Sequence, residues 1–343
     1  MQRGASLAKR LVGSEASMYD LMGYSQVVHR LMQHITQVAR TDFTVIIQGE
    51  TGTGKELVAR CIHQQSPRAS GAFVAVDCGA IPDNLAESEL FGYMKGAFTG
   101  AACKKAGYFE LAQSGTLFLD EITNLSPTIQ MKLLRSIQEH HIVPLGSETC
   151  LQTNIRLIAA TNVSLEEEVQ AGRFRADLFH RLNEFTVLLH PLRARREDIL
   201  FLAERFRREV ATELGKESHG FTPEAQAYLL MYDWPGNVRE LRNAVRRAVL
   251  LSHRVIDCKH LRQTLTPPAV TLRVAENTIL PPLPPLPHGQ GLHELVRDMA
   301  EQLEKTLIQQ MLRETHGNKR LAAQRLQIGY KTLFRKLQAY NIQ

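Results

Sequence analysis

Two hydrophobic patterns alternate along the first part of the chain. Short apolar runs of five or six residues are separated by longer segments whose apolar positions recur every three or four residues. One such segment, Thr128–Gln138, is predicted as a helix with Ile129, Leu133, Leu134 and Ile137 on one face. This alternation predicts a parallel sheet covered on both faces. The runs predicted as strands are Thr44–Gln48, Phe73–Asp77, Thr116–Asp120, Ile155–Ala160 and Phe185–Leu189.

After Pro191 the pattern becomes helical, and we expect the strands to stop there. Asn237–Leu251 is predicted as one helix, and Glu197–Glu213 is predicted as another because four apolar residues form a stripe along it. A small helical subdomain should therefore follow the sheet. The residues of the stripe are Ile199, Ala203, Phe206 and Val210.

A proline-rich segment follows. Seven of the fourteen prolines lie between Thr266 and Gln290, and such a segment cannot join a helix or an inner strand. A semi-rigid linker between two folded parts is the favoured interpretation. A ligand for proline-reading domains is the alternative.

A second helical region follows the linker. Leu292–Arg313 carries an apolar stripe that suits a dimer or bundle core, made of Leu295, Met299, Leu303, Leu307 and Met311. Two short helical runs then flank a glycine-containing turn at Gln327–Tyr330, which predicts a helix-turn-helix, with a plain two-helix hairpin as the alternative. The residues expected to hold this fold are Leu326, Ile328, Leu333 and Leu337.

Composition excludes several classes of protein. A chain of 343 residues with 44% hydrophobic and 22% charged residues is typical of a globular protein of two or three domains. Its five cysteines are scattered, which excludes a disulfide scaffold or a zinc finger and fits a reducing cytosol. The basic segment Met1–Arg10 is not followed by an apolar stretch, so we expect no secretion signal. Nowhere do eighteen apolar residues run together, so we expect no membrane span.

Charge is concentrated at the C-terminus. The net charge is +6, and Thr315–Gln343 contains six basic residues and no acidic one, so the rest of the chain sums to zero. A solvated basic tail is the simple interpretation. Together with the two helices, the charge favours a nucleic-acid-binding module.

A glycine-rich loop lies between a predicted strand and a predicted helix. Gly49–Lys55 reads GETGTGK, and in this position its backbone N–H groups and Lys55 can bind a polyphosphate. A glycine turn with a chance lysine is the alternative. Glu56 stands where a hydroxyl ligand for magnesium is usual.

Two carboxylates end another apolar strand. Asp120 can hold Mg²⁺, and Glu121 can polarise an attacking water, if they share a site with the loop. By itself, an apolar run that ends in Asp-Glu is commonly a strand that meets solvent. The pairing with Gly49–Lys55 favours catalysis.

The order of motifs completes the pattern. GETGTGKE, ELFG, GAFTGA, LFLDEI, AATN and WPGNVREL follow one another between Met22 and Leu251. This order resembles the AAA+ activators of sigma-54 RNA polymerase, the bacterial enhancer-binding proteins, and the C-terminus resembles their Fis-type module. The resemblance implies an α/β AAA+ P-loop parallel sheet with a helical lid subdomain, plus an all-α helix-turn-helix domain. The expected division is an N-terminal tail 1–21, an ATPase core 22–190, a lid 191–265, a linker 266–290 and a DNA-binding domain 291–343.

The resemblance also implies roles for individual residues. Asp120 would be the Mg²⁺ ligand and Glu121 catalytic, Asn162 would sense the γ-phosphate, and Arg175 and Arg181 would be arginine fingers that reach ATP in a neighbouring subunit. Without the family, Asn162 is a turn residue, and the two arginines pair with Asp177 or Glu184 on the surface. The residues implied for nucleotide binding are Gly49, Glu50, Thr51, Gly52, Thr53, Gly54, Lys55, Glu56 and, as second sensor, Arg239.

Two surfaces would carry the partners. The resemblance implies that the loop Gly96, Ala97, Phe98, Thr99, Gly100 and Ala101 grips the sigma-54 factor. A phenylalanine at a mobile, exposed tip is costly in water without a partner, and a generic glycine-rich turn is the alternative. The residues implied to face enhancer DNA are Lys319, Arg320, Lys331, Thr332, Arg335 and Lys336.

Three positions stand out from the family pattern or from the composition. Asp77 stands where many members have an asparagine that restrains the catalytic glutamate, and two carboxylates there would repel each other. His180 stands where a tyrosine is frequent, which we interpret as neutral packing variation. Trp234 is the only tryptophan, and we interpret it as a core anchor of the lid.

The sequence therefore predicts a cytoplasmic sigma-54-dependent activator that uses ATP and Mg²⁺ and assembles from a dimer to a hexameric ring on enhancer DNA. Only 48 residues precede the loop at Gly49, too few for a receiver domain of about 120 residues. Control is expected from a separate regulatory protein, expression level or the N-terminal tail, unless the chain is a truncation. The rival classes are a replication initiator or helicase loader, and a DNA-binding repressor that uses ATP only as an assembly switch.

Overall fold

The computed structural model describes residues 15–99, 101–265, 301, 304–305, 307–309, 311–312, 315, 318–326 and 328–340. Gly100, the proposed linker 266–290 and most of the N-terminal tail lie outside these residues, as do Leu295, Met299 and Leu303. The chain forms two units, Met1–Ala269 and Val270–Gln343, which are described separately. No helix in the described ranges is long and apolar enough to cross a membrane.

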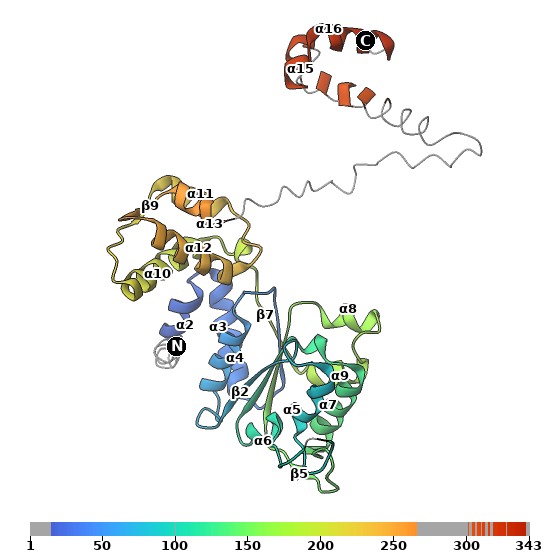
Figure 1. The fold of residues 1–343 in the computed structure, drawn as a ribbon. Coiled ribbons are helices and arrows are strands. Elements are labelled where there is room, and N and C mark those ends of the chain that lie inside the picture. Colours follow the sequence, from blue (N-terminus) through green and yellow to red (C-terminus); the bar gives the residue numbers. More distant parts are fainter. Residues whose placement is uncertain are drawn as a thin grey trace, which may run out of the picture. The chain divides into compact units, whose positions relative to one another are not determined.

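A parallel sheet lies at the centre of the first unit (Figure 1). Within the described residues it has five strands in the order β2-β3-β6-β1-β7. The observed bounds differ from the predicted ones by at most one residue, because buried parallel strands appear in a sequence as continuous apolar runs. The strands are β1 (Val45–Gln48), β2 (Phe73–Asp77), β3 (Thr116–Asp120), β6 (Arg156–Thr161) and β7 (Phe185–Leu188).

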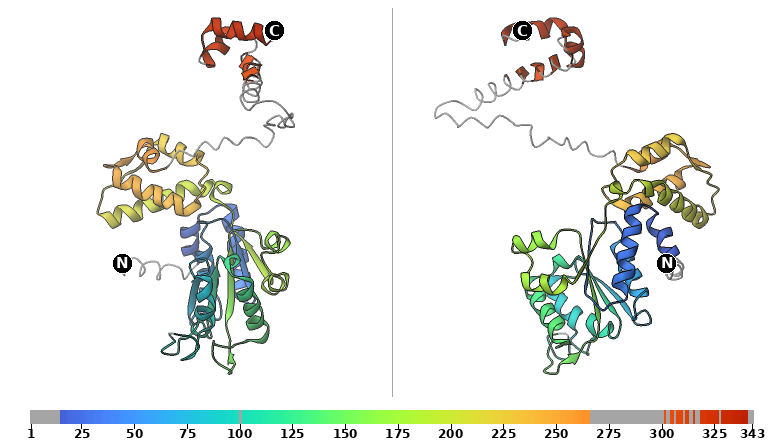
Figure 2. Two further views of the ribbon diagram at one scale, coloured as in Figure 1. Left: turned by 45° about the vertical axis from the view of Figure 1, so that its right-hand side comes forward. Right: turned by 180° about the vertical axis from the view of Figure 1, so that it is seen from behind.

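Side chains along the strands alternate between two cores. Leu117 and Leu119 of β3 pack on one face with α5, α6, α7 and α9, whereas Phe118 packs on the other with α2, α3 and α4. The alternation follows from the pleat of a strand, and the two helical layers flank the sheet (Figure 2). The helices are α2 (Glu15–Met22), α3 (Gln26–Ala39), α4 (Lys55–Gln64), α5 (Asp83–Phe91), α6 (Tyr108–Leu111), α7 (Pro127–Glu139), α8 (Leu165–Gln170) and α9 (Ala176–Leu182), with the 3₁₀ turn η1 (Ile122–Asn124) and the hairpin β4 (His141–Ile142) and β5 (Leu151–Gln152).

The lid has its own core. Trp234 is fully buried there, and its Nε1 donates to the Leu229 carbonyl at 2.9 Å, as expected for a core anchor. The expectation that strands stop after Pro191 is wrong, because Gly220–Phe221 (β8) pairs in parallel with Val255–Ile256 (β9). Strands of two residues are too short to show a period. The other elements are η2 (Leu192–Ala194), α10 (Glu197–Leu214), α11 (Pro223–Met231), α12 (Asn237–Leu251) and α13 (Cys258–Thr264).

The folded part of the chain begins earlier than expected. The predicted tail ran to residue 21, but Glu15–Met22 forms α2, with Met18 and Met22 buried against the helical layer of the sheet. Positions four apart share one face of a helix, so this short segment contributes two core residues.

The second unit contains the predicted helix pair, α15 (Lys319–Arg325) and α16 (Tyr330–Ala339). Leu333 and Leu337 are buried, and Leu326 and Ile328 pack against them, as the sequence indicated. The preceding helical residues differ from expectation, because Ile308 and Leu312 are buried whereas Leu307 is half exposed. Met311 of the predicted stripe also packs against this core, so the apolar face that meets α15 and α16 combines Met311 with Ile308 and Leu312.

Candidate functional site

The phosphate-binding loop connects β1 to α4. Gly49 N donates to the Thr161 carbonyl of β6 at 3.1 Å, which fixes the start of the loop to the sheet. Gly52 has a φ of +81°, and a Cβ on it would lie 2.4 Å from the carbonyl oxygen of Gly236 in the lid. Both observations require a glycine at this position. The lid backbone therefore closes directly on the loop.

Lys55 lies in the site with the two carboxylates of the β3 end. It is 7% exposed, and its Nζ donates to the Gly49 carbonyl at 3.0 Å. Burial lowers the pKa of Lys55, while Asp120 and Glu121 act in the opposite direction. Burial likewise raises the pKa of Asp120, which Lys55 opposes. The partly desolvated ammonium of Lys55 can bind a phosphate, and the carboxylate of Asp120 beside it can bind a metal cation.

Three adjacent strands bring the predicted catalytic groups to one edge of the sheet. β6 lies between β3 and β1, so Asn162, which follows β6, lies between the carboxylates after β3 and the loop after β1. Because the strands are parallel, these carboxyl ends meet at the same edge. Asn162 is exposed there. The topology thus assembles residues that are more than a hundred positions apart in the sequence.

Glu121 adopts an unusual backbone conformation. Its φ is +52°, which is uncommon for a residue other than glycine, and its N–H donates to Asp120 Oδ1 at 3.0 Å. The turn η1 follows directly, and Asn124 Nδ2 donates to Glu121 Oε2 at 2.8 Å. Sequence reasoning did not identify Asn124.

The N-terminus of α12 holds the loop from the lid side. Asn237 is fully buried, and its Nδ2 donates at 3.1 Å both to Glu50 Oε2 and to the Thr51 carbonyl. Val238 N and Arg239 N donate to the Gly52 carbonyl at 3.1 and 3.3 Å. Neither Asn237 nor these backbone contacts were predicted, although Asn237 lies within the WPGNVREL motif.

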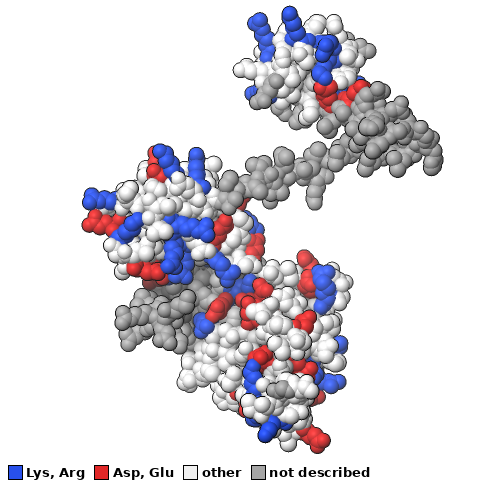
Figure 3. All heavy atoms as spheres, viewed as in Figure 1, with Lys and Arg blue, Asp and Glu red and all other residues white. Residues whose placement is uncertain are grey.

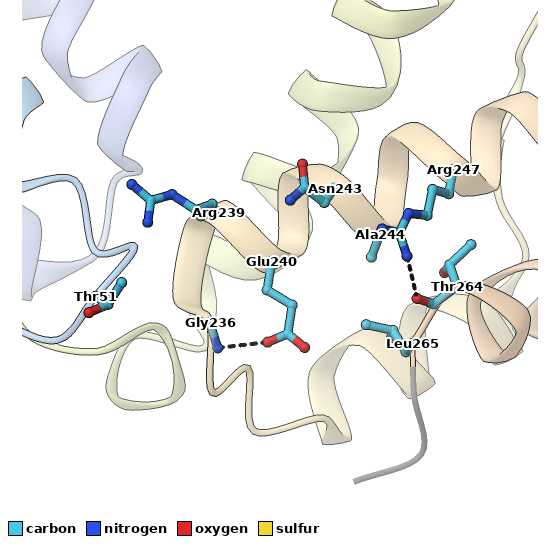
Figure 4. A pocket seen from close by; sticks show the side chains of 9 residues that line it. All are labelled: Thr51, Gly236, Arg239, Glu240, Asn243, Ala244, Arg247, Thr264 and Leu265. Carbon is cyan, nitrogen blue, oxygen red and sulfur yellow. Dashed lines mark hydrogen bonds between the residues drawn. The ribbon is translucent and has the colours of Figure 1, made fainter. Parts of the chain in front are cut away.

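Arg239 lies beside the loop. It lines a pocket of about 330 Å³ together with Thr51 of the loop (Figure 4), and its Cβ lies 3.2 Å from a Cβ built on Gly52. The structure therefore brings Arg239 to the phosphate-binding loop. The remaining lining residues are Gly236, Glu240, Asn243, Ala244, Arg247, Thr264 and Leu265.

Two acidic side chains of the loop region are already paired. Glu50 accepts from Arg193 Nη1 at 2.8 Å, and this arginine is the main cause that lowers the pKa of Glu50. Glu56 is exposed and accepts from Arg60 Nε at 2.9 Å. No sequence pattern indicates the contact between Arg193 and Glu50, because the two residues are 143 positions apart.

Both predicted arginine fingers form the surface ion pairs that the sequence offered as the alternative. Arg175 binds Asp177 with two contacts, Nε to Oδ1 at 3.0 Å and Nη2 to Oδ2 at 2.7 Å. Arg181 lies 4.0 Å from Glu184. Their role toward a neighbouring subunit stays a prediction.

The GAFTGA loop is exposed at Phe98. This side chain is 45% exposed, and its ring packs edge-on against Tyr93 with centroids 5.0 Å apart. Gly96 N donates to the Ala101 carbonyl at 2.9 Å and closes the loop. Thr99 is exposed beside Phe98.

The basic side chains of the C-terminal helices are not equivalent. Lys331 and Arg335 of α16 and Arg320 of α15 are exposed, whereas Thr332 and Lys319 are half-buried. Lys336 forms an ion pair with Glu304 at 2.5 Å. Figure 3 shows basic side chains standing out from this unit. Lys331 and Arg335 are thus the cations that α16 presents to solvent.

Comparison with known proteins agrees with this geometry. The sigma-54 interaction domain family matches residues 21–188, the AAA+ ATPase lid domain matches residues 193–276, and the Fis family of bacterial regulatory proteins matches residues 300–340. The transcriptional regulatory protein ZraR of Klebsiella oxytoca is 46% identical over 322 residues, which cover 94% of this chain and 69% of ZraR. The chain belongs to the sigma-54-dependent transcriptional activators. It is an AAA+ ATPase with a Fis-type helix-turn-helix.

Other relatives support the same assignment. The anaerobic nitric oxide reductase transcription regulator NorR of Salmonella arizonae is 43% identical, over 92% of this chain and 62% of NorR. A crystal structure of NtrX from Brucella abortus in complex with ATP matches with a TM-score of 0.67 and 32% identity, over 96% of this chain and 72% of that one. The activator family and the α/β AAA+ fold predicted from the sequence are thereby confirmed.

Proposed function

We propose that this activator binds enhancer DNA, hydrolyses ATP in a ring of identical subunits and uses the energy to convert the closed sigma-54 RNA polymerase complex into the open one. The main observation in support of ATP hydrolysis is that the phosphate-binding loop, Asp120, Glu121 and Asn162 lie at one edge of the sheet. Kinship with NtrX, whose structure was solved with ATP, supports nucleotide binding at this edge.

The loop and lid would hold ATP between them. Backbone N–H groups of Gly49–Lys55 and the Lys55 ammonium would bind the phosphates, and Arg239 would contact them from α12. Glu121 would accept a proton from the attacking water, and Asn162 would sense the γ-phosphate. Glu56 would act only indirectly, because its carboxylate is paired with Arg60.

Asp120 fits the protein ligand of Mg²⁺. Among the described residues, no group of three or more His, Cys, Asp or Glu side chains could hold a metal by itself. Mg²⁺ in nucleotide sites commonly takes one or two carboxylates and completes its shell with phosphate and water. When bound, it would neutralise charge on the phosphates.

The neighbouring subunit would complete the site. Arg175 and Arg181 would supply positive charge in trans, which is worth roughly 10³–10⁵ in rate in related reactions. Head-to-tail contacts of this kind close into rings, and a hexamer is the expected assembly.

The two exposed surfaces would bind the partners. The loop Gly96–Ala101 would grip the sigma-54 factor through Phe98 and Thr99, and Lys331 and Arg335 would contact DNA from α16. These assignments are supported by the exposure of the four side chains.

The decisive experiment combines ATP hydrolysis with sigma-54 binding. We expect the protein with ADP and an aluminium fluoride mimic to co-elute with sigma-54, and Thr99→Ala to keep hydrolysis while losing both co-elution and transcription activation. Glu121→Gln should abolish turnover but retain nucleotide binding. Full ATPase activity without any sigma-54 complex would refute the proposed partner, and turnover by Glu121→Gln would refute the proposed base.

A further inference from the structure

The sequence predicts a repulsion between Asp77 and Glu121, and the structure shows how Asp77 is placed. Asp77 ends β2 opposite Asp120 in the sheet register, so it lies beside the catalytic edge. Its Oδ1, however, accepts the N–H of Gly79 at 2.9 Å. The Asp77 carboxylate is therefore engaged in its own turn, and it has no hydrogen to donate to Glu121 in its ionised form.

The donor to Glu121 comes from another element. Asn124, the last residue of η1, makes two contacts with Glu121: its backbone N–H donates to the Glu121 carbonyl at 2.9 Å, and its Nδ2 donates to Oε2 at 2.8 Å. The positive φ of Glu121 starts this turn. Backbone and side chain of one residue thus fix the catalytic carboxylate.

Gly79 provides the space for this pair. A Cβ on Gly79 would lie 2.7 Å from Asn124 Nδ2, 2.7 Å from Glu121 Oε2 and 3.4 Å from Asp77 Oδ1. The three side chains therefore surround one point, and the backbone at Gly79 lies close to the hydrogen bond between Asn124 and Glu121. A larger residue there would displace the amide or the carboxylate.

We propose that Asn124 is the positioning residue for Glu121. The proposal rests on the function above, in which Glu121 accepts the proton of the attacking water. Fixing Oε2 of Glu121 orients Oε1, the oxygen that would take this proton. Because the Asn124 amide is neutral, it holds the carboxylate without adding a positive charge to the site. In this chain the restraint comes from the turn after β3, and Asp77 does not supply it.

The test uses Asn124→Ala in the full-length chain. We expect kcat for ATP to fall by about tenfold or more, because misplaced catalytic groups cost rate steeply, while KM and ADP affinity stay unchanged. Thr123→Ala, at the neighbouring position of the same turn, is the matched control and should hydrolyse ATP normally.

Two further variants keep the proposal testable. Asn124→Asp preserves size but replaces the donor with a carboxylate, so it should lose more activity than Asn124→Ala, and it decides the matter if the alanine variant fails to fold. Adding Asp77→Asn to Asn124→Ala offers an amide from the other side of the same space and should recover part of kcat. A wild-type kcat for both Asn124→Ala and Asn124→Asp, or a loss that appears in KM and not in kcat, would overturn the positioning role. Activity of Glu121→Gln itself would instead overturn the proposed base.

Discussion

Asn237 joins three parts of the first unit, and its substitution gives a quantitative test of how the lid holds the nucleotide site. Its Oδ1 accepts the Leu192 N–H at 2.8 Å, and its Nδ2 binds Glu50 and the Thr51 carbonyl. The side chain is fully buried, and the backbone has a φ of +51°. Both the side chain and the conformation therefore contribute to the free energy of unfolding.

The two contributions can be separated by substitution. Asn237→Ala leaves the buried Leu192 N–H without a partner, which costs about 1–3 kcal/mol, and it places alanine in a left-handed conformation, which costs about 1–2 kcal/mol. Asn237→Gly removes the side chain but tolerates the conformation, so only the first cost applies. We expect Asn237→Ala to lose about 2–5 kcal/mol and Asn237→Gly about 1–3 kcal/mol.

Thermal unfolding and titration with a fluorescent ADP analogue measure the two effects. At about 2–4 °C per kcal/mol, Tm should fall in the order wild type, Asn237→Gly, Asn237→Ala. Both variants should bind the analogue more weakly, because the contacts that hold Glu50 and Thr51 are lost. A Tm for Asn237→Gly equal to that of wild type would refute the side-chain contribution, and equal Tm values for the two variants would refute the conformational one.

Three further predictions concern other sites. Gly52→Ala should lose ADP binding in the same titration, because its Cβ would lie 2.4 Å from the Gly236 carbonyl, whereas Gly172→Ala, with a similar φ of +70° but open space, should keep it; equal affinities would contradict the close contact. Burial raises the pKa of Cys78 to about 12, so mass spectrometry after iodoacetamide treatment at pH 8 should find the exposed Cys103 and Cys150 alkylated and Cys78 unmodified until the protein unfolds; rapid alkylation of native Cys78 would show that it is accessible. Lys331→Ala should reduce the salt slope of DNA binding by about one, and Lys336→Ala should reduce it less because Lys336 is paired with Glu304; a larger effect of Lys336→Ala would refute this ranking.

The sheet and its edge could be predicted because their sequence signals are local and strong. The apolar run Thr116–Asp120 fixes a buried strand, and the carboxylates at its end mark where the strand leaves the sheet. Parallel topology then places that end beside the loop after β1 without further information. The helix pair at the C-terminus could be predicted for the same reason, since its buried leucines recur at helical spacing.

The contacts that hold Glu121 and Glu50 in place could not be predicted from the sequence. They depend on backbone conformation and tertiary packing, which the spacing of apolar residues does not indicate. The bond from Asn124 to Glu121 requires a positive φ at a glutamate, which sequence patterns do not indicate. Asn237 and Arg193 reach Glu50 from the lid, across more than 140 positions. Such contacts become visible only when the lid is placed on the loop.

In the proposed ring, the two predicted arginine fingers would have to leave the ion pairs that they form in the single chain. Arg175 is held by Asp177 through two parallel contacts, whereas the charged groups of Arg181 and Glu184 are 4.0 Å apart. Exposed pairs of this kind contribute little to stability, so a phosphate of the neighbouring subunit can replace either carboxylate at small cost. Because the Arg175 pair has the better geometry, breaking it costs more free energy than breaking the Arg181 pair. The isolated chain therefore keeps its proposed fingers paired with its own carboxylates, and in the proposed ring a neighbour carrying ATP would exchange these partners for phosphate.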